Sequence, residues 1–464
     1  MKPRAFLLAP LAAWLSGCSP QAYRPVAIAP QSTAAQLEAR SLDDPGLRAW
    51  MGQAAGFEPT SWPLAAWDLH ALTLAAYYFN PKMDVARAQA AAAGAAIQTA
   101  AMKPNPSVSA GSGWESSPES PYLLAFNFSL PIETAGKRGY RIAEATHLSQ
   151  ASRIQVGETA WAVRSQVRAA LVNLVFAREA LELLGRQQAA EIQYVDLLEA
   201  RLGAGEISLP EVASARIDLA NLRQAVRTAE SEVETGRATL AAAIGIPLSG
   251  LAGKSVAWPG IDTPPAPAAL PAEGMRSEAV ANRLDVQRAL AEYEAAQSRL
   301  QLEVARQYPD IELGPGYAFE EGVHLISLQL GAVLPLRNRN QGPIAEAEAQ
   351  RKAAGAQLLA TQSSVIAQAD SALAAYKSSF AVFDESRHAL VAVQSQQRTA
   401  AELLQRGEAD RLAAVSADVQ AAAALRAQLD AARQVQLALG GLEDALQRPM
   451  DPATTPNLPL QAPR

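Results

Sequence analysis

The chain has 464 residues, of which 49% are hydrophobic and 19% are charged, and its formal net charge is −6. No basic block is present, which argues against nucleic acid as a partner. After the N-terminal segment no run of about 18 apolar residues occurs, so the sequence predicts no transmembrane helix. Much of the apolar content is alanine, which favours helices packed closely side by side.

The N-terminus has the features of a cleavable targeting segment. Lys2 and Arg4 precede an apolar run that is too short to span a bilayer. Cys18 is the single cysteine and follows the sequence Leu-Ser-Gly, so it has no partner for an intramolecular disulfide. These residues resemble the signal of a bacterial lipoprotein, which implies removal of residues 1–17 and lipidation of Cys18. The alternative is an unmodified thiol.

An internal repeat runs through the chain. Six pairs of matching segments occur in the same order, and their members are 201 to 204 residues apart. The pairs are 84–88 and 285–289, Pro106 and Pro309, Pro131 and Pro335, 142–145 and 344–347, 205–206 and 407–408, and Pro247 and Pro449. We therefore expect a duplicated structure.

Each half predicts the same order of elements: a helix, a β-hairpin, and a long helical hairpin. The first helices are expected at about 84–103 and 275–307, the strands at about 107–130 and 310–334, and the helical hairpins at about 141–245 and 343–447. The expected organisation is a signal peptide at 1–17, a lipid-anchored tether and equatorial segment at 18–80, a first repeat at 81–252, a proline-rich linker at 253–274, a second repeat at 275–448 and a C-terminal tail at 449–464. The fold class is mainly α with a small β part.

The long helices carry a heptad pattern. Apolar residues spaced alternately four and three apart predict a seam for a neighbouring helix, at Val156, Ala160, Val163, Val167, Ala170, Leu174, Ala177, Leu181 and Leu184. A helix of about 60 residues would reach roughly 90 Å, so it needs partners along its whole length. Taken alone, this pattern is typical of a coiled-coil scaffold.

The strands alternate between an apolar and a small or polar series. The apolar residues expected to face lipid are Tyr122, Leu124, Phe126 and Phe128 in the first hairpin and Ile326, Leu328 and Leu330 in the second. This period of two is what a transmembrane β-barrel requires, although a half-buried hairpin in a soluble domain gives the same pattern. Four strands cannot close a barrel by themselves, whereas three copies would contribute twelve.

Several motifs, together with the duplication, resemble the TolC-like outer-membrane efflux protein family. They are Tyr-Pro-Asp-Ile at 308–311, Gly-Pro-Gly-Tyr at 314–317, Leu-Pro-Leu at 334–336, Arg-Asn-Gln-Gly at 339–342, and the turns at 205–208 and 406–410. The resemblance implies a homotrimer with a twelve-stranded barrel in the outer membrane and an α-helical barrel in the periplasm. The segments 39–50, 80–90 and 104–106 also resemble the heavy-metal branch of the family.

The resemblance further implies partners at the periplasmic tip. A periplasmic adaptor protein and an inner-membrane pump, of the RND type, would act with the channel, and the adaptor would dock on the two helical turns. The corresponding residues are Arg201, Gly203, Gly205, Glu206, Arg406, Gly407, Glu408 and Asp410. Where acidic residues close the aperture in well-known members, this chain has small or apolar residues such as Ala413 and Ser416. The candidate replacements are Glu408, Asp410 and Asp418, and the alternative is a gate held in another way.

Nothing in the sequence indicates an enzyme. The four histidines are isolated, and none has the spacing of a metal-ligand set, so no metal, cofactor or catalytic residue is predicted. Two functions remain: a passive exit duct driven by its partners, and a structural coiled-coil lipoprotein of the outer membrane without channel activity. The strand faces distinguish them, because a scaffold does not require an apolar surface towards lipid.

Overall fold

A computed structural model describes residues 22–58, 61–114, 116, 122–270, 274–320 and 322–450. The chain divides into two units, Met1–Arg40 and Ser41–Arg464. In the first unit, residues 22–29 have no regular structure and helix α2 spans Pro30–Glu38, none of whose residues is buried. The predicted lipidation residue Cys18 lies outside the described residues.

The second unit contains nine described α-helices and one antiparallel sheet. Its helices are α3 (Pro45–Ala55), α4 (Leu69–Phe79), α5 (Pro81–Ala100), α6 (Lys137–Gly203), α7 (Leu209–Ile244), α8 (Met275–Asn282), α9 (Leu284–Ala305), α10 (Gln341–Gln405) and α11 (Arg411–Leu446). The strands are β1 (Ser107–Trp114), β2 (Tyr122–Ile132), β3 (Ile311–Glu320) and β4 (Val323–Ala332), in the order β1-β2-β3-β4. The expectation of a mainly helical chain with a small antiparallel sheet is confirmed.

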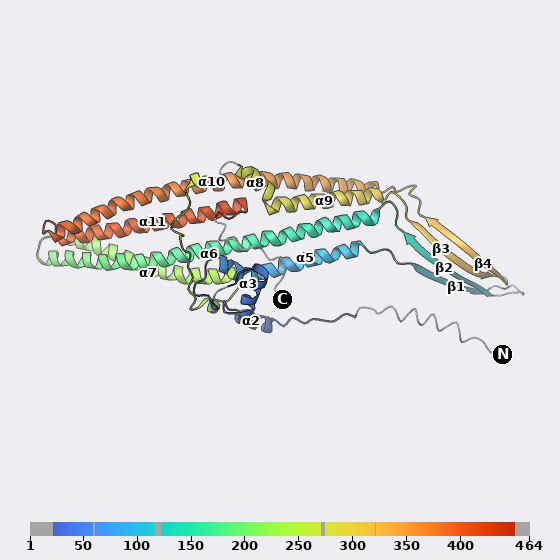
Figure 1. Ribbon diagram of the computed structural model, residues 1–464, viewed down its shortest axis with the longest axis horizontal. Coiled ribbons are helices and arrows are strands. Elements are labelled where there is room, and N and C mark those ends of the chain that lie inside the picture. The colour runs from blue at the N-terminus through green and yellow to red at the C-terminus, as the bar shows by residue number, and fades with distance from the viewer. Residues whose placement is uncertain are drawn as a thin grey trace. The chain divides into compact units, whose positions relative to one another are not determined.

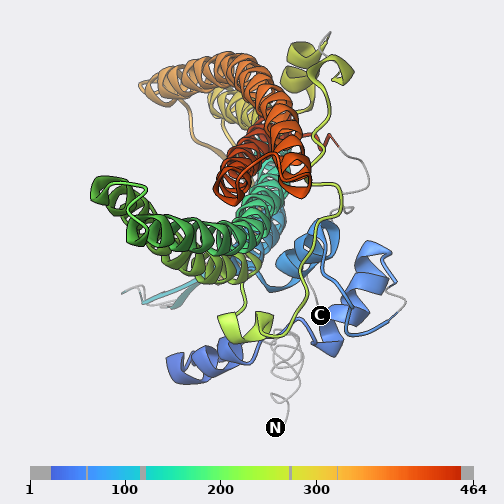
Figure 2. The same cartoon turned by 90° about the vertical axis from the view of Figure 1, so that its left-hand side faces the viewer.

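Two long helical hairpins form the body of this unit. Helix α6 pairs with α7 and α10 pairs with α11, and the two hairpins join where α6 packs against α11 (Figure 1). The sheet lies at one end of the hairpins and their turns lie at the other. Seen from the turns, α6–α7 and α10–α11 are separate pairs (Figure 2). The predicted seam of α6 is buried except at Ala177 and Leu181, which are half-buried, and Val163, Val167 and Leu174 are completely enclosed.

The two halves make equivalent contacts at nearly equivalent positions of the repeat. The Asn80 side chain, between α4 and α5, donates to the Ala243 carbonyl at 2.8 Å. Arg283, between α8 and α9, donates to the Ala445 carbonyl at 3.0 Å. In each half, therefore, a polar side chain at a break between two helices binds the last turn of the returning helix.

The single helix predicted at 275–307 is wrong in one respect: the chain leaves the helical conformation at Arg283, where ψ is 133°. The extended conformation lets the Arg283 guanidinium reach Ala445 and pair with Asp285 at 2.7 Å. In the first half the equivalent break is marked by Pro81, which follows Asn80.

The proline-rich segment after residue 252 was expected to be an extended linker, and it is fastened to both halves. Val256 pairs with Trp67 as an isolated β-bridge, and Ile261 is buried in the second core. Tyr376 of α10 donates its hydroxyl to the Pro265 carbonyl, and burial raises the pKa of Tyr376 to about 12. This segment therefore contacts the first half at Trp67 and the second half at Tyr376 of α10.

A buried group of charges joins α6 to α11. Arg164 and Arg168 both contact the Glu443 carboxylate, at 3.1 and 3.0 Å, and all three side chains are almost completely enclosed. Arg168 also donates to the Gln436 carbonyl at 2.8 Å. The pKa of Arg168 is lowered overall, because burial lowers it by more than the neighbouring Glu443 carboxylate raises it. Gly440 lies beneath this guanidinium, so a Cβ there would collide with Arg168 Nη1 and come within 3.2 Å of Cζ.

We expect Gly440→Ala to be less stable than Gly441→Ala by about 1–3 kcal/mol, the usual cost of overpacking. The methyl group added at position 440 would displace Arg168 from Glu443 and Gln436, whereas a Cβ added at position 441 meets no atom within 4 Å. Both substitutions gain the same helix propensity, so the difference in stability between the two variants measures the effect of the collision alone. Thermal unfolding followed by circular dichroism in detergent, at equal protein concentrations, measures it. Equal stabilities would show that Arg168 moves aside freely.

Candidate functional site

The sheet has an uncovered apolar face. Directly paired residues of antiparallel strands lie on the same face, and Phe126, Tyr317 and Ile326 form one such row. The register places all seven predicted lipid-facing residues on this face: Tyr122, Leu124, Phe126, Phe128, Ile326, Leu328 and Leu330. Phe126 is 50% exposed and Ile326 is 83% exposed. The single chain thus presents a continuous apolar surface that no other described part of it covers.

Toward the helices the opposite face is small and polar, whereas Leu123, Val323 and Leu325 lie on it near the far end of the strands. Asn127 pairs with Gly316, whose missing Cβ would lie 2.6 Å from Ser327 Oγ and 2.8 Å from Asn127 Oδ1. Gln329 donates to the same Asn127 oxygen at 3.5 Å. A hollow of about 510 Å³ lies on this face, lined by Ser107, Ser109, Asn127, Ser129, Glu312, Gly314, Gln329 and Gly331, and also by Phe128 and Leu330 of the alternate, apolar series. The two faces of the sheet therefore suit different surroundings: one suits an apolar environment and the other suits water.

An ion pair fixes the sheet to the long helix. Lys137 Nζ, at the start of α6, contacts Asp310 Oδ1 at 2.7 Å and donates to the Tyr308 carbonyl at 2.6 Å. Asp310 also accepts from the Thr134 backbone at 2.9 Å. Burial raises the pKa of Asp310, but the hydrogen bonds from Lys137 and Thr134 outweigh it, so the pKa is lowered overall. Lys137 was not among the predicted site residues, since the pair joins positions 173 residues apart.

The two helical turns at the other end have the same backbone structure. Gly205 donates to the Leu202 carbonyl at 3.0 Å and Glu206 to the Arg201 carbonyl at 2.9 Å. In the second turn, Gly407 donates to Leu404 at 3.0 Å and Glu408 to Leu403 at 2.9 Å. Both are Schellman motifs, with φ of 77° at Gly205 and 75° at Gly407.

Gly203 does not contribute to the turn geometry. It is the last residue of α6, and of the two glycines in this turn Gly205 has the positive φ. Gly205 is therefore the glycine that ends α6.

An ion pair connects the two turns. Arg201 of the first hairpin contacts the Asp410 carboxylate of the second, and its Nε lies 3.9 Å from Glu206. Asp410 also caps α11 by accepting from the Leu412 backbone at 3.3 Å. The predicted tip residues Glu206, Arg406 and Glu408 are exposed nearby on the two turns. The structure thus gathers the predicted tip residues at one end of the hairpins.

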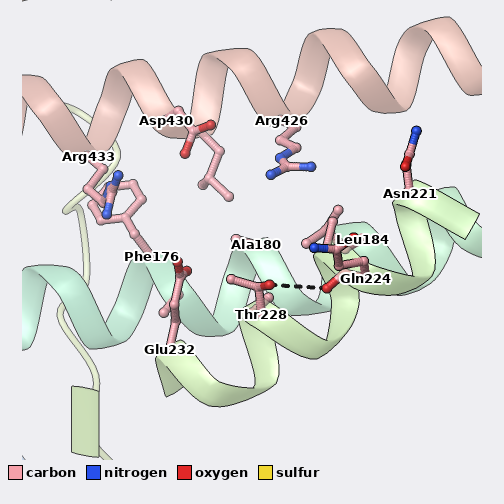
Figure 3. A pocket seen from close by; sticks show the side chains of 14 residues that line it. Phe176, Ala180, Leu184, Asn221, Gln224, Thr228, Glu232, Arg426, Asp430 and Arg433 are labelled. Atoms are coloured by element: carbon pink, nitrogen blue, oxygen red, sulfur yellow. Dashed lines mark hydrogen bonds between the residues drawn. The ribbon is translucent and has the colours of Figure 1, made fainter. Parts of the chain in front are cut away.

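Between the turns and the buried charges, a groove of about 450 Å³ separates α7 from α11 over α6 (Figure 3). Helix α11 contributes Arg426, Asp430 and Arg433, which face Asn221, Gln224 and Thr228 of α7. No ion pair within 4 Å bridges the groove among these described residues. The two hairpins are therefore held together through α6 and α11, and α7 stands apart from α11 here.

None of the described helices has an apolar stretch long enough to cross a membrane. Among the described residues no three His, Cys, Asp or Glu side chains are grouped as a metal ion would require.

Residues 76–246 match the family model described as outer membrane efflux protein. The cobalt-zinc-cadmium resistance protein CzcC of Cupriavidus metallidurans is 26% identical over 238 residues, which are 51% of this chain and 56% of that protein. The chain thus matches little more than half the length of this relative. The resemblance indicated by the sequence motifs is confirmed.

Solved structures share the fold. The outer membrane protein VceC of Vibrio cholerae has a TM-score of 0.65 at 19% identity, covering 82% of this chain and 97% of that one. The outer-membrane channel OprN has a TM-score of 0.67 at 17% identity, covering 92% of this chain and 98% of that one. At these identities the likeness concerns the architecture alone.

We expect Asp310→Asn to lower the thermal stability at neutral pH, because it leaves the buried Lys137 ammonium without its carboxylate. The pKa of Asp310 is lowered in the folded state, so its contribution is present above the ordinary value of 3.8 and is lost as the pH falls below it. The difference in melting temperature between Asp310→Asn and the unsubstituted protein should therefore become smaller at acidic pH. Heat denaturation across a pH series measures it.

Glu312→Gln is the matched control, since it removes a carboxylate two residues further along that forms no ion pair among the described residues. An equal loss of stability in both variants would contradict the role of the Lys137–Asp310 pair.

Proposed function

We propose that this chain, a member of the outer membrane efflux protein family by the match over residues 76–246, is the outer-membrane channel subunit of an efflux system. The observation that carries the proposal is the uncovered apolar face of the sheet opposite a small, polar face. Contiguous exposed apolar surface of this kind marks a membrane or protein contact. Lipid outside and water inside account for both faces.

The channel requires three copies. Strands β1 and β4 are the edges of the sheet, and unpaired backbone groups at such edges are not tolerated in lipid. Pairing β4 of one copy with β1 of the next satisfies both edges. Three copies then give a twelve-stranded barrel, and their helical hairpins form the periplasmic barrel below it. Cyclic symmetry makes each such contact identical.

The turns are the proposed docking sites for a periplasmic adaptor, and an inner-membrane pump of the RND type supplies the energy. Their paired Schellman motifs present Glu206, Arg406 and Glu408 at an exposed end. The similarity to CzcC, whose name describes cobalt, zinc and cadmium resistance, supports metal ions as the exported class. Lipidation at Cys18 would anchor the assembly.

Phe126→Lys is expected to impair assembly in the outer membrane, because a lysine on the lipid face costs roughly 2–4 kcal/mol near the bilayer centre. Asn127→Lys places the same charge one residue away on the polar face, where water is available, and should assemble. The yield of heat-resistant trimer in outer-membrane fractions measures the effect. Equal yields would favour a scaffold without a barrel, as would a detergent-free monomeric extract of the unsubstituted protein.

The double substitution Glu408→Ala with Asp410→Ala is expected to raise single-channel conductance in planar bilayers. It removes the Asp410 partner of Arg201 and so releases one hairpin turn from the other. Glu206→Ala is the control on the same tip, because its contact with Arg201 is long, at 3.9 Å. An unchanged closed-state current in the double variant would remove both residues from the gate.

A further inference from the structure

We propose that Glu312 sets the ion selectivity of the duct, by placing a ring of three carboxylates inside the barrel at its helical end. The inference rests on the proposed trimeric channel and adds to it a selectivity-determining residue. Its chemical consequence is that small cations pass the barrel more readily than small anions do.

The register places Glu312 on the polar face. Glu312 pairs with Gly331 of β4 and with Pro131 of β2, and it follows the same alternation as Gly314 and Gly316. It lines the hollow on that face, and its carboxylate approaches Ser129 Oγ at 3.4 Å. If the apolar face meets lipid, the Glu312 carboxylate projects into the water of the channel.

The neighbours of Glu312 leave its charge accessible. The facing residue is Gly331, where a Cβ would lie 3.6 Å from that of Glu312, so no side chain covers the carboxylate from β4. Strands β1 to β4 contain no Lys or Arg. The one histidine in these strands, His324, lies on the apolar face, where its Nδ1 is 2.7 Å from the Tyr317 hydroxyl.

The nearby Asp310 does not share this role, because Lys137 neutralises it at 2.7 Å. The other carboxylate on the polar face is Glu320, the last residue of β3. Glu320 lies eight positions after Glu312 along β3, a distance of about 27 Å at roughly 3.4 Å per residue. This distance exceeds the screening length of about 10 Å in 0.1 M salt, so the two carboxylates act independently.

Reversal potentials of the full-length trimer in planar bilayers under a KCl gradient test the proposal. Glu312→Gln, which preserves shape, is expected to lower the ratio of potassium to chloride permeability about twofold or more, and Glu312→Lys to invert the preference. Glu320→Gln carries the same charge change on the same face at the strand end, and should leave the ratio near its original value. Heat-resistant trimer on gels verifies assembly of each variant.

An unchanged permeability ratio in an assembled, conducting Glu312→Gln channel would overturn the selectivity role and leave the channel function standing. Equal effects of Glu312→Gln and Glu320→Gln would also overturn it, because the preference would then follow overall charge and not this position. Unsubstituted protein without single-channel steps would overturn both the proposed function and this inference.

Discussion

The buried contact of Arg164 and Arg168 with Glu443 is the constraint on which the arrangement of the two halves depends. It joins residues 279 positions apart and fixes the middle of α6 against the C-terminal end of α11. Removing one partner of such a group leaves an uncompensated buried charge, at a cost of about 3–5 kcal/mol. The arginines also stack on aromatic rings, Arg164 on Trp161 and Arg168 on Trp258. The halves therefore cannot slide past one another without exposing or isolating a charge.

Away from this point the hairpins are joined more weakly. The groove between α7 and α11 contains charged side chains that form no bridging ion pair among the described residues, and the tips meet through the exposed pair Arg201–Asp410. Separating an exposed pair costs about 0–1 kcal/mol, less than the roughly 3–5 kcal/mol that leaving one charge of the buried cluster unpaired would cost. A strong central junction and a weak distal one would allow the turns to separate while the middle stays in place. This distribution of strength suits a tip that opens.

Elements with a regular period or a marked end were predictable from sequence. Helices α6 and α7 together span Lys137–Ile244, near the hairpin expected at about 141–245, because the heptad seam of α6 is continuous and a glycine marks the turn. The break at Arg283 was not predicted, since no proline marks it. Nor was helix α4, whose residues are apolar all round and show no period. Arg164 and Arg168 did carry a signal, because two arginines four residues apart adjoin the buried seam, but their partner is too distant in sequence to identify.

The sheet is the feature that leads us to assign the proposed function to an assembly. Within one chain its apolar face is uncovered and its outer strands have free edges, two features that a stable monomer in water avoids. The proposed trimer would resolve both, because neighbouring copies would pair their edges while lipid covers the apolar face. In that arrangement the polar face would be the interior, and its glycines, serines and Glu312 would line the channel. Because the Lys137–Asp310 pair fixes the sheet to α6, closing the proposed barrel would also position the helical hairpins beneath it.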